Sequence, residues 1–226
     1  MKNYLAEFTG TFGFVFIGWG AVLFAKPFIG YLGISMAFGM AYAAVCFAFP
    51  DGHFNPAATI ASALSGVFGT GGKFRTFLNT IGYILMQIAG AVAAVALVQF
   101  IYSGKTGYVH QEPVNSFIVD RYTMSAAFYL ELILNFLFAS VFLSTYHSKT
   151  NKPIACGLFI TAAYLFSYPV TKGAINPART TAAAIFGGKE AVAQLPVFWE
   201  AAVAAAILAG LFHNPFVGRL FEKKSK

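Results

Sequence analysis

Two short boxes contain the residue types in this sequence that are best suited to chemistry. They are Asn55-Pro56-Ala57 and Asn176-Pro177-Ala178-Arg179, and each opens an apolar segment. Asparagine followed by proline is a good helix start, because the asparagine caps the first turn and the proline has no N–H to lose. An asparagine amide also offers N–H donors to a polar molecule. The boxes therefore predict hydrogen-bonding groups at two helix N-termini, although a lone asparagine there is usually only a cap.

Catalytic and metal-binding chemistry finds little support in the rest of the sequence. The eight acidic residues are scattered, no His, Cys, Asp or Glu set has the spacing of metal ligands, and there is no glycine-rich phosphate loop. Cys46 and Cys156 both lie in apolar stretches, which indicates buried thiols and no disulfide framework. We therefore expect no enzyme activity, no cofactor and no metal.

The composition predicts an integral membrane protein. Of 226 residues, 58% are hydrophobic and 10% are charged, whereas soluble domains carry roughly 25% charged residues. The net charge of +7 does not indicate nucleic-acid binding, because no basic cluster alternates with aromatic residues on a polar face. The apolar run after Lys2 resembles a signal peptide, but Glu7 interrupts it and no small-residue cleavage site follows. We interpret it as a first membrane helix.

Six segments are approximately long and apolar enough to cross a bilayer, which takes about 20 helical residues. They are residues 4–25, 31–49, 77–102, 124–146, 153–168 and 195–212. Two shorter apolar segments, residues 56–64 and 177–186, follow the boxes and reach only about half-way across. They could lie flat on the membrane surface, but neither has the basic polar face of an interfacial helix. Re-entrant half-helices are therefore favoured, in an all-α membrane fold.

The same order of elements occurs twice. Asn55 follows Glu7 of the first span by 48 residues, and Asn176 follows Glu131 of the fourth span by 45. Three spans in each half place the second copy upside down, so residues 1–113 and 114–226 are expected to form an inverted repeat within one transmembrane domain. Such repeats place a functional site at the membrane midplane, between the two halves.

The basic residues favour cytoplasmic termini, because cytoplasmic loops are enriched in lysine and arginine. With six spans and an internal N-terminus, six basic residues lie outside and nine lie inside: Lys2, Lys73, Arg75, Lys149, Lys152, Arg219, Lys223, Lys224 and Lys226. We expect the plasma (inner) membrane as the location, with both termini in the cytoplasm.

Half-helices that enter from opposite faces bring both N-termini to one place, and each N-terminus carries about half a positive charge. A cation is repelled there, whereas water is not. Asn55 and Asn176 would bind a passing water oxygen from two sides, which turns its hydrogens outward and interrupts a proton relay. Arg179 is predicted to line a constriction, since a charge at membrane depth normally faces a water-filled cavity. The alternative is an arginine that snorkels to the interface.

Charged or polar side chains near the boxes need partners at this depth. Glu7 and Glu131 are costly unless they accept hydrogen bonds, and we predict that both are structural supports, with proton relay as the alternative. His53, just before the first box, is expected to bond to backbone in the loop.

The paired boxes, with Ala6-Glu7-Phe8 near the start and Phe198-Trp199 in the last span, resemble the aquaporin family, and within it the bacterial water-channel branch. The resemblance covers essentially the whole chain. It implies a homotetramer in the lipid bilayer with one water pore per subunit, and glutamates that accept hydrogen bonds from the re-entrant loops. It also implies a selectivity filter of Phe38, Tyr164, Gly173 and Arg179.

Two filter positions depart from the water channels of that family. Tyr164 stands where they usually carry histidine, and Gly173 stands where they carry a small residue, often cysteine or threonine. The larger ring and the missing side chain could compensate in width. Thr180 stands where glycerol facilitators carry aspartate, and Tyr164 where they carry glycine, which favours the water branch.

Our interpretation is a passive water channel that excludes protons and ions. The first alternative is a broader channel for glycerol, urea or ammonia, because of Tyr164 and Gly173. A coupled transporter also fits an inverted repeat with broken helices, but it needs titratable groups at the midplane. A membrane enzyme is the most distant alternative.

Overall fold

A computed structural model describes residues 2–69, 72–107 and 122–215, and these ranges are helical throughout apart from short connections. The spanning elements are α1 (Lys2–Gly20), η1 (a π-helical turn, Ala21–Ala25), α2 (Lys26–Ala48), α4 (Lys73–Ser103), α5 (Met124–Thr145), α6 (Asn151–Thr171) and α8 (Gly188–Phe212). The shorter helices are α3 (Pro56–Ser65) and α7 (Pro177–Phe186). The predicted repeat boundary at residues 113 and 114 lies outside the described residues, as do Arg121, Arg219, Lys223, Lys224 and Lys226.

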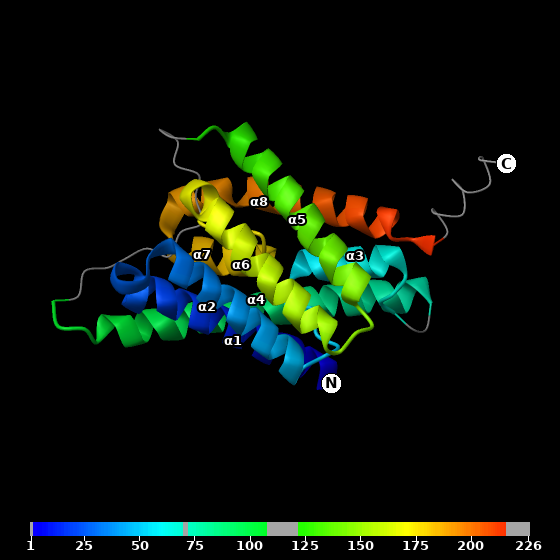
Figure 1. The fold of residues 1–226 in the computed structure, drawn as a ribbon, viewed down its shortest axis with the longest axis horizontal. Helices are drawn as coiled ribbons and strands as arrows, with labels where there is room; N and C mark the ends of the chain where they lie inside the picture. Colours follow the sequence, from blue (N-terminus) through cyan, green and yellow to red (C-terminus); the bar gives the residue numbers. More distant parts are fainter. Residues whose placement is uncertain (1, 70–71, 108–121, 216–226) are drawn as a thin grey trace.

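The first two spans form one nearly continuous helical run, Lys2–Ala48, of 47 residues. At 1.5 Å per residue it would be about 70 Å long if straight, more than twice the bilayer core. Gly30 interrupts it with φ 56° and ψ −164°, a backbone conformation that glycine adopts without a Cβ clash. The chain doubles back there, and α1 and α2 lie antiparallel (Figure 1). Gly30 lies in the interval between the predicted spans 4–25 and 31–49, although α2 already begins at Lys26.

The other spans confirm the predicted order with small shifts at their ends. α4 begins at Lys73 and α8 at Gly188, ahead of the predicted residues 77 and 195. α6 continues through Pro169 to Thr171 instead of ending at Tyr168. Proline is tolerated in membrane helices because neighbouring groups satisfy the freed backbone carbonyls.

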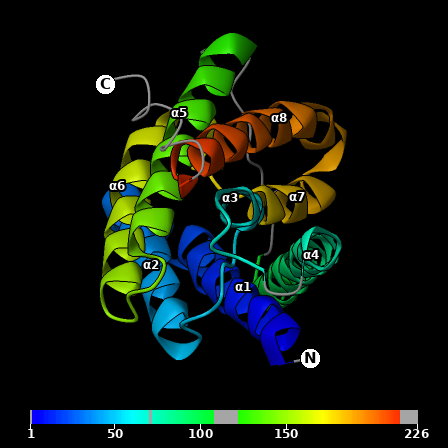
Figure 2. The same ribbon diagram turned by 90° about the vertical axis from the view of Figure 1, so that its right-hand side faces the viewer.

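The two short helices pack among the spanning helices. Seen along the long axis, α3 lies in the middle of the bundle and α7 lies between α4 and α8 (Figure 2). Close approach depends on small residues. A Cβ added to Gly90 of α4 would lie 2.4 Å from the Phe8 carbonyl oxygen of α1, and one added to Gly210 of α8 would lie 2.9 Å from the Ala61 carbonyl oxygen of α3.

The exterior of the bundle is unusually apolar, while several charged and polar side chains are buried inside it. Buried side chains include Glu7, Gln87, Glu131, Asn135 and Arg179. The exposed side chains include many large apolar ones, among them Leu5, Phe28, Leu32, Phe74, Leu85, Phe100, Leu158, Phe166 and Phe212. An apolar exterior with charged groups buried inside fits a lipid environment, and the chain is an integral membrane protein.

Candidate functional site

The two boxes meet at the centre of the bundle. The Asn55 side-chain amide donates a hydrogen bond to the Ile175 carbonyl oxygen at 3.0 Å, and the Asn176 amide donates to the Phe54 carbonyl oxygen at 2.7 Å. Each asparagine thus bonds to the residue that precedes the other one. The N-termini of α3 and α7 therefore lie against each other, as the re-entrant arrangement predicts.

Each asparagine also caps its own half-helix. The Asn55 side-chain oxygen accepts from the Ala57 N–H at 2.9 Å. The Asn176 oxygen accepts from the N–H groups of Ala178 and Arg179 at 3.1 and 3.3 Å. The cap fixes the direction of the amide, and the cross-bond uses one of its two N–H donors. A second donor on each amide is left for a molecule that passes between the boxes.

The residue before each asparagine has a strained backbone. Phe54 has φ 53° and Ile175 has φ 35°, values that are rare for residues other than glycine and most unusual for a β-branched one. Such strain persists only where the surroundings enforce it. The strain recurs at matching positions of the two halves. It directs the Phe54 carbonyl towards Asn176 and the Ile175 carbonyl towards Asn55. The residue types at these two positions do not indicate the strained backbone in the sequence.

Glu7 holds the first loop in this conformation. Its two oxygens accept hydrogen bonds from the backbone N–H groups of His53 at 2.7 Å and Phe54 at 2.8 Å. The Gln87 side chain of α4 donates a third bond to Glu7 at 2.7 Å and also reaches Thr59 Oγ1 at 2.9 Å. Gln87 was not identified from the sequence, where its only signal is a polar side chain inside an apolar span.

Glu131 occupies the matching position beside the second loop. It accepts hydrogen bonds from the Ile175 N–H at 2.8 Å and the Thr171 hydroxyl at 2.5 Å. Thr171 lies in the last turn of α6, beyond the predicted end of that span. The helix must therefore pass Pro169 for this contact to form.

His53 differs from its expected role. Its ring nitrogens lie 3.1 Å from the Thr59 hydroxyl and 3.2 Å from the Tyr146 hydroxyl, so its partners are side chains and not backbone. The rings of Phe68 and Tyr83 also pack against it, with centroids 4.8 and 5.2 Å away. These contacts bury the imidazole completely.

The four residues of the expected filter contact one another. Arg179 is fully buried, and its guanidinium donates to the carbonyl oxygens of Gly173 at 2.5 Å and Lys172 at 3.1 Å. The guanidinium carbon lies 4.7 Å from the Phe38 ring centroid and 5.1 Å from that of Tyr164. Arg179 thus lies inside the bundle and does not extend to a membrane surface.

Tyr164 occupies the space beside Gly173. A Cβ added to Gly173 would lie 2.9 to 3.2 Å from three atoms of the Tyr164 ring. Gly173 also has φ 66°, and Lys172 before it has φ 59°, so the turn itself favours glycine. The Tyr164 hydroxyl is buried and has no hydrogen-bond partner in the described part of the chain.

A family model described as Major intrinsic protein matches residues 1–213. The chain belongs to the major intrinsic protein family. The resemblance to aquaporins drawn from the two boxes is thereby confirmed. This is a family of membrane channels, and the buried boxes of α3 and α7 are the central feature of its fold in this chain.

Two bacterial relatives of this chain are both named Aquaporin Z. The protein from Rhodopseudomonas palustris is 33% identical over 228 residues, covering 94% of this chain and 92% of the relative. The protein from Bradyrhizobium diazoefficiens is 33% identical over 229 residues, covering 95% and 92%.

Among solved structures, the aquaglyceroporin from Plasmodium falciparum has the same fold as this major intrinsic protein. The two superpose with a TM-score of 0.83 over 98% of each chain, at 20% sequence identity. At that identity the likeness concerns the fold and not the solute.

Proposed function

We propose that this chain is a passive water channel that excludes ions and protons. The observation that carries the proposal is the mutual contact of Phe38, Tyr164 and Arg179. The two rings are 4.6 Å apart between centroids, and the guanidinium carbon lies 4.7 and 5.1 Å from them. Groups packed this closely leave room beside them for a narrow path at most, which favours water over a solute with several heavy atoms.

The contact between Tyr164 and Gly173 supports the same selectivity. The ring lies where a side chain at residue 173 would otherwise stand, so the bulk lost at one filter position is replaced from the other. This supports the interpretation that the two departures compensate in width. Arg179 would repel cations, because its charge is permanent.

The boxes supply a second barrier to charge. The N-termini of α3 and α7 meet at the cross-bonds of Asn55 and Asn176, and their partial positive charges add at that point. A hydronium ion would meet both charges in a setting of low dielectric constant. A water molecule that accepts hydrogen bonds from both amides cannot also accept a proton along the file.

We assign Glu7 and Glu131 to structural support. Each carboxylate accepts hydrogen bonds from the loop before a box, so both are engaged in holding backbone conformation. Their arrangement gives no support to coupled transport, which needs a carboxylate that is free to exchange protons with the pore.

The larger assembly belongs to the same proposal. We propose that residues 1–113 and 114–226 act as the two inverted halves of one pore, that both termini lie in the cytoplasm, and that the protein resides in the plasma (inner) membrane as a homotetramer. Glu7 accepts a hydrogen bond from the Phe54 N–H and Glu131 accepts one from the Ile175 N–H, and these matching contacts support the inverted halves. The family resemblance supports the tetramer.

A broader channel for small neutral solutes is the second candidate. The observation that favours it is the buried Tyr164 hydroxyl, which has no partner among the described residues. That hydroxyl could bond to a second polar group of a permeating solute. One of the structural relatives is named as an aquaglyceroporin, so membership of the family does not itself decide between the two.

Stopped-flow light scattering on reconstituted liposomes tests the proposal. Vesicles that contain the protein should shrink much faster than bare lipid in a sucrose gradient, with slow re-swelling in glycerol and urea and no proton leak. Arg179→Ala should admit larger solutes and increase cation leak. Rapid re-swelling of wild-type vesicles in glycerol would instead establish the broader channel, and shrinkage no faster than that of bare lipid would refute a pore.

A further inference from the structure

Two adjacent residues of α1 contact the filter from behind, although neither is one of the four expected filter positions. A Cβ added to Gly18 would lie only 1.9 to 2.5 Å from three carbons of the Phe38 ring. The ring therefore occupies the space that any side chain at residue 18 would fill. Phe38 is fully buried, so its position depends on this vacancy in α1.

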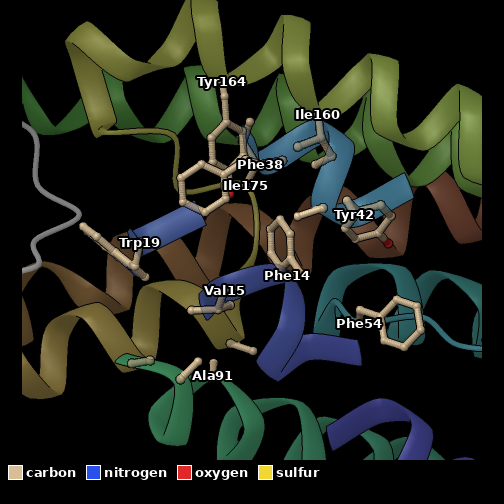
Figure 3. Packing of buried hydrophobic residues seen from close by; sticks show 14 of the residues in the cluster. Phe14, Val15, Trp19, Phe38, Tyr42, Phe54, Ala91, Ile160, Tyr164 and Ile175 are labelled. Carbon is tan, nitrogen blue, oxygen red and sulfur yellow. The ribbon is translucent and has the colours of Figure 1, made fainter. Parts of the chain in front are cut away.

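Trp19 contacts the other wall of the filter. Its indole ring is 3% exposed, and the Arg179 guanidinium carbon lies 5.0 Å from the ring centroid. Together with Phe38 and Tyr164, Trp19 places three aromatic rings within about 6 Å of one cation, the range in which aromatic faces attract a positive charge. Figure 3 shows Trp19, Phe38 and Tyr164 in one part of the buried cluster, on α1, α2 and α6.

The contact of Trp19 with Arg179 is one of packing and charge. The indole N–H is buried and has no hydrogen-bond partner in the described ranges. The guanidinium itself donates to the carbonyl oxygens of Lys172 and Gly173. Trp19 thus adds a face against which the guanidinium rests while its donors hold the loop.

We propose that Gly18 and Trp19 are positioning residues that set the aperture of the filter, one for each wall. Gly18 lets Phe38 withdraw towards α1, and Trp19 keeps Arg179 against the loop before the second box. This inference rests on the proposed function of the filter and deepens it. It assigns to α1 a part in selectivity that the filter residues alone do not show.

The proposal requires that two neighbouring substitutions change the width of the filter in opposite directions. In Gly18→Ala the new methyl group displaces the Phe38 ring towards its other neighbours, Tyr164 and Arg179, and narrows the opening. In Trp19→Ala the guanidinium loses one of its three rings, and the opening widens. If these residues served only to pack the bundle, both substitutions would reduce the permeability to all solutes together.

The experiment measures water and glycerol permeability per reconstituted protein for wild type and these variants. Gly18→Ala should lower water permeability about tenfold, which corresponds to about 1.4 kcal/mol in the barrier, with glycerol still excluded. Trp19→Ala should raise glycerol permeability about tenfold, and Trp19→Phe should restore exclusion because it keeps an aromatic face. The proposal would be overturned if both alanine variants lowered, or both raised, the permeability to water and glycerol together. It would also be overturned if Trp19→Phe stayed permeable to glycerol.

Two further variants separate a blocked filter from a misfolded chain. Gly18→Ala combined with Phe38→Leu removes the clash and should recover water flux. Gly20→Ala is the matched control on the same helix, because the nearest atom to its added Cβ is 4.0 Å away, and it should behave as wild type. A double variant that stays closed would refute the assigned role of Gly18.

A spectroscopic readout keeps this inference distinct from the proposed function. The chain has two tryptophans, so Trp199→Phe leaves Trp19 as the only indole. In that background, Arg179→Ala should change the emission of Trp19 because it removes the cation from the ring. An unchanged spectrum would refute the contact. A changed spectrum in a protein without water flux would refute the water channel while leaving the contact in place.

Discussion

Tyr164 and Gly173 share the bulk that decides the width of the filter. The phenol ring lies against the glycine so closely that a Cβ at residue 173 would lie 2.9 Å from a ring carbon. Selectivity between solutes then depends on the Tyr164 ring, because Gly173 has no side chain to restrict the filter. A substitution at Tyr164 or Gly173 therefore also changes the packing of the other residue.

Tyr164→Ala is expected to open the filter to glycerol. Removing the ring leaves space beside Gly173 that no neighbouring side chain fills, so glycerol permeability should rise about tenfold or more, while water permeability is kept. Re-swelling of proteoliposomes in glycerol measures it. Phe166→Ala is a control on the same helix, since the Phe166 side chain is exposed on the exterior of the bundle. Continued exclusion of glycerol by Tyr164→Ala would show that another group sets the width.

Glu7→Ala is expected to destabilise the protein strongly. It leaves the N–H groups of His53 and Phe54 without their acceptor and removes one of the two acceptors of the Gln87 amide, and each unsatisfied buried donor costs about 1 to 3 kcal/mol. The strained conformation of Phe54 also loses the bond that holds it. Thermal unfolding of the detergent-solubilised protein should show a markedly lower midpoint than wild type.

Glu7→Gln is the matched variant, because it keeps one oxygen for the loop, and its loss of stability should be smaller. Its water flux should not depend on pH. A pH-dependent loss of flux in a folded Gln variant would favour proton relay over structural support.

Helix packing depends on positions where two backbones touch. Gly90 of α4 lies so close to α1 that an added Cβ would stand 2.4 Å from the Phe8 carbonyl oxygen and 3.2 Å from the Phe12 nitrogen. A backbone cannot yield as the end of a side chain can. Gly13, also in the first span, has only ordinary contact with a side-chain carbon of Val45 at 3.4 Å.

Gly90→Val should therefore destabilise the bundle far more than Gly13→Ala. Forcing the two helices apart loses packing along both, and overpacking of this kind costs about 1 to 3 kcal/mol or more. Because Gln87 lies one turn earlier on α4, its bond to Glu7 would also lengthen and the first box would shift. Thermal midpoints and water flux of the two variants give the comparison. Equal stability of the two would mean that α1 and α4 separate without cost.

The elements were largely predictable from the sequence, and their contacts were not. Apolar length and the Asn-Pro starts were sufficient for six spans and two half-helices. The interval between the first two spans was predicted at residues 26–30, but only the backbone shows that Gly30 makes the turn within it. The strain at Phe54 and Ile175 arises from tertiary hydrogen bonds, so no local pattern could indicate it.

The same limit applies to the candidate site. Asn55, Asn176 and Arg179 were found because their residue types are conspicuous in apolar surroundings. Trp19 could not be, since a tryptophan in a membrane span is ordinary and only the fold brings it to Arg179. Residues whose effect depends on a vacancy, such as Gly18, become visible only when the neighbour that fills it is known.

The whole molecule contains both boxes and all four filter residues in a single chain. The cross-bonds between Asn55 and Asn176 join its two halves within one bundle, so no neighbouring subunit is needed to complete the proposed pore. Assembly into a tetramer would then multiply pores without coupling them. This separates the proposed channel from one in which a central pore forms between subunits.

Mixed assemblies test this independence. We expect glycerol permeability to rise linearly with the fraction of Tyr164→Ala chains when these are co-expressed with wild type, purified together through two different affinity tags and reconstituted at constant total protein. Each variant chain would open its own pore whatever its neighbours are. Water flux should stay constant over the series, because wild-type and variant pores both conduct water, and native mass spectrometry would give the subunit number and the mixing ratio. A curve that rises steeply only when most subunits are variant would mean that the permeation path is shared between chains, and the single-chain pore would have to be abandoned.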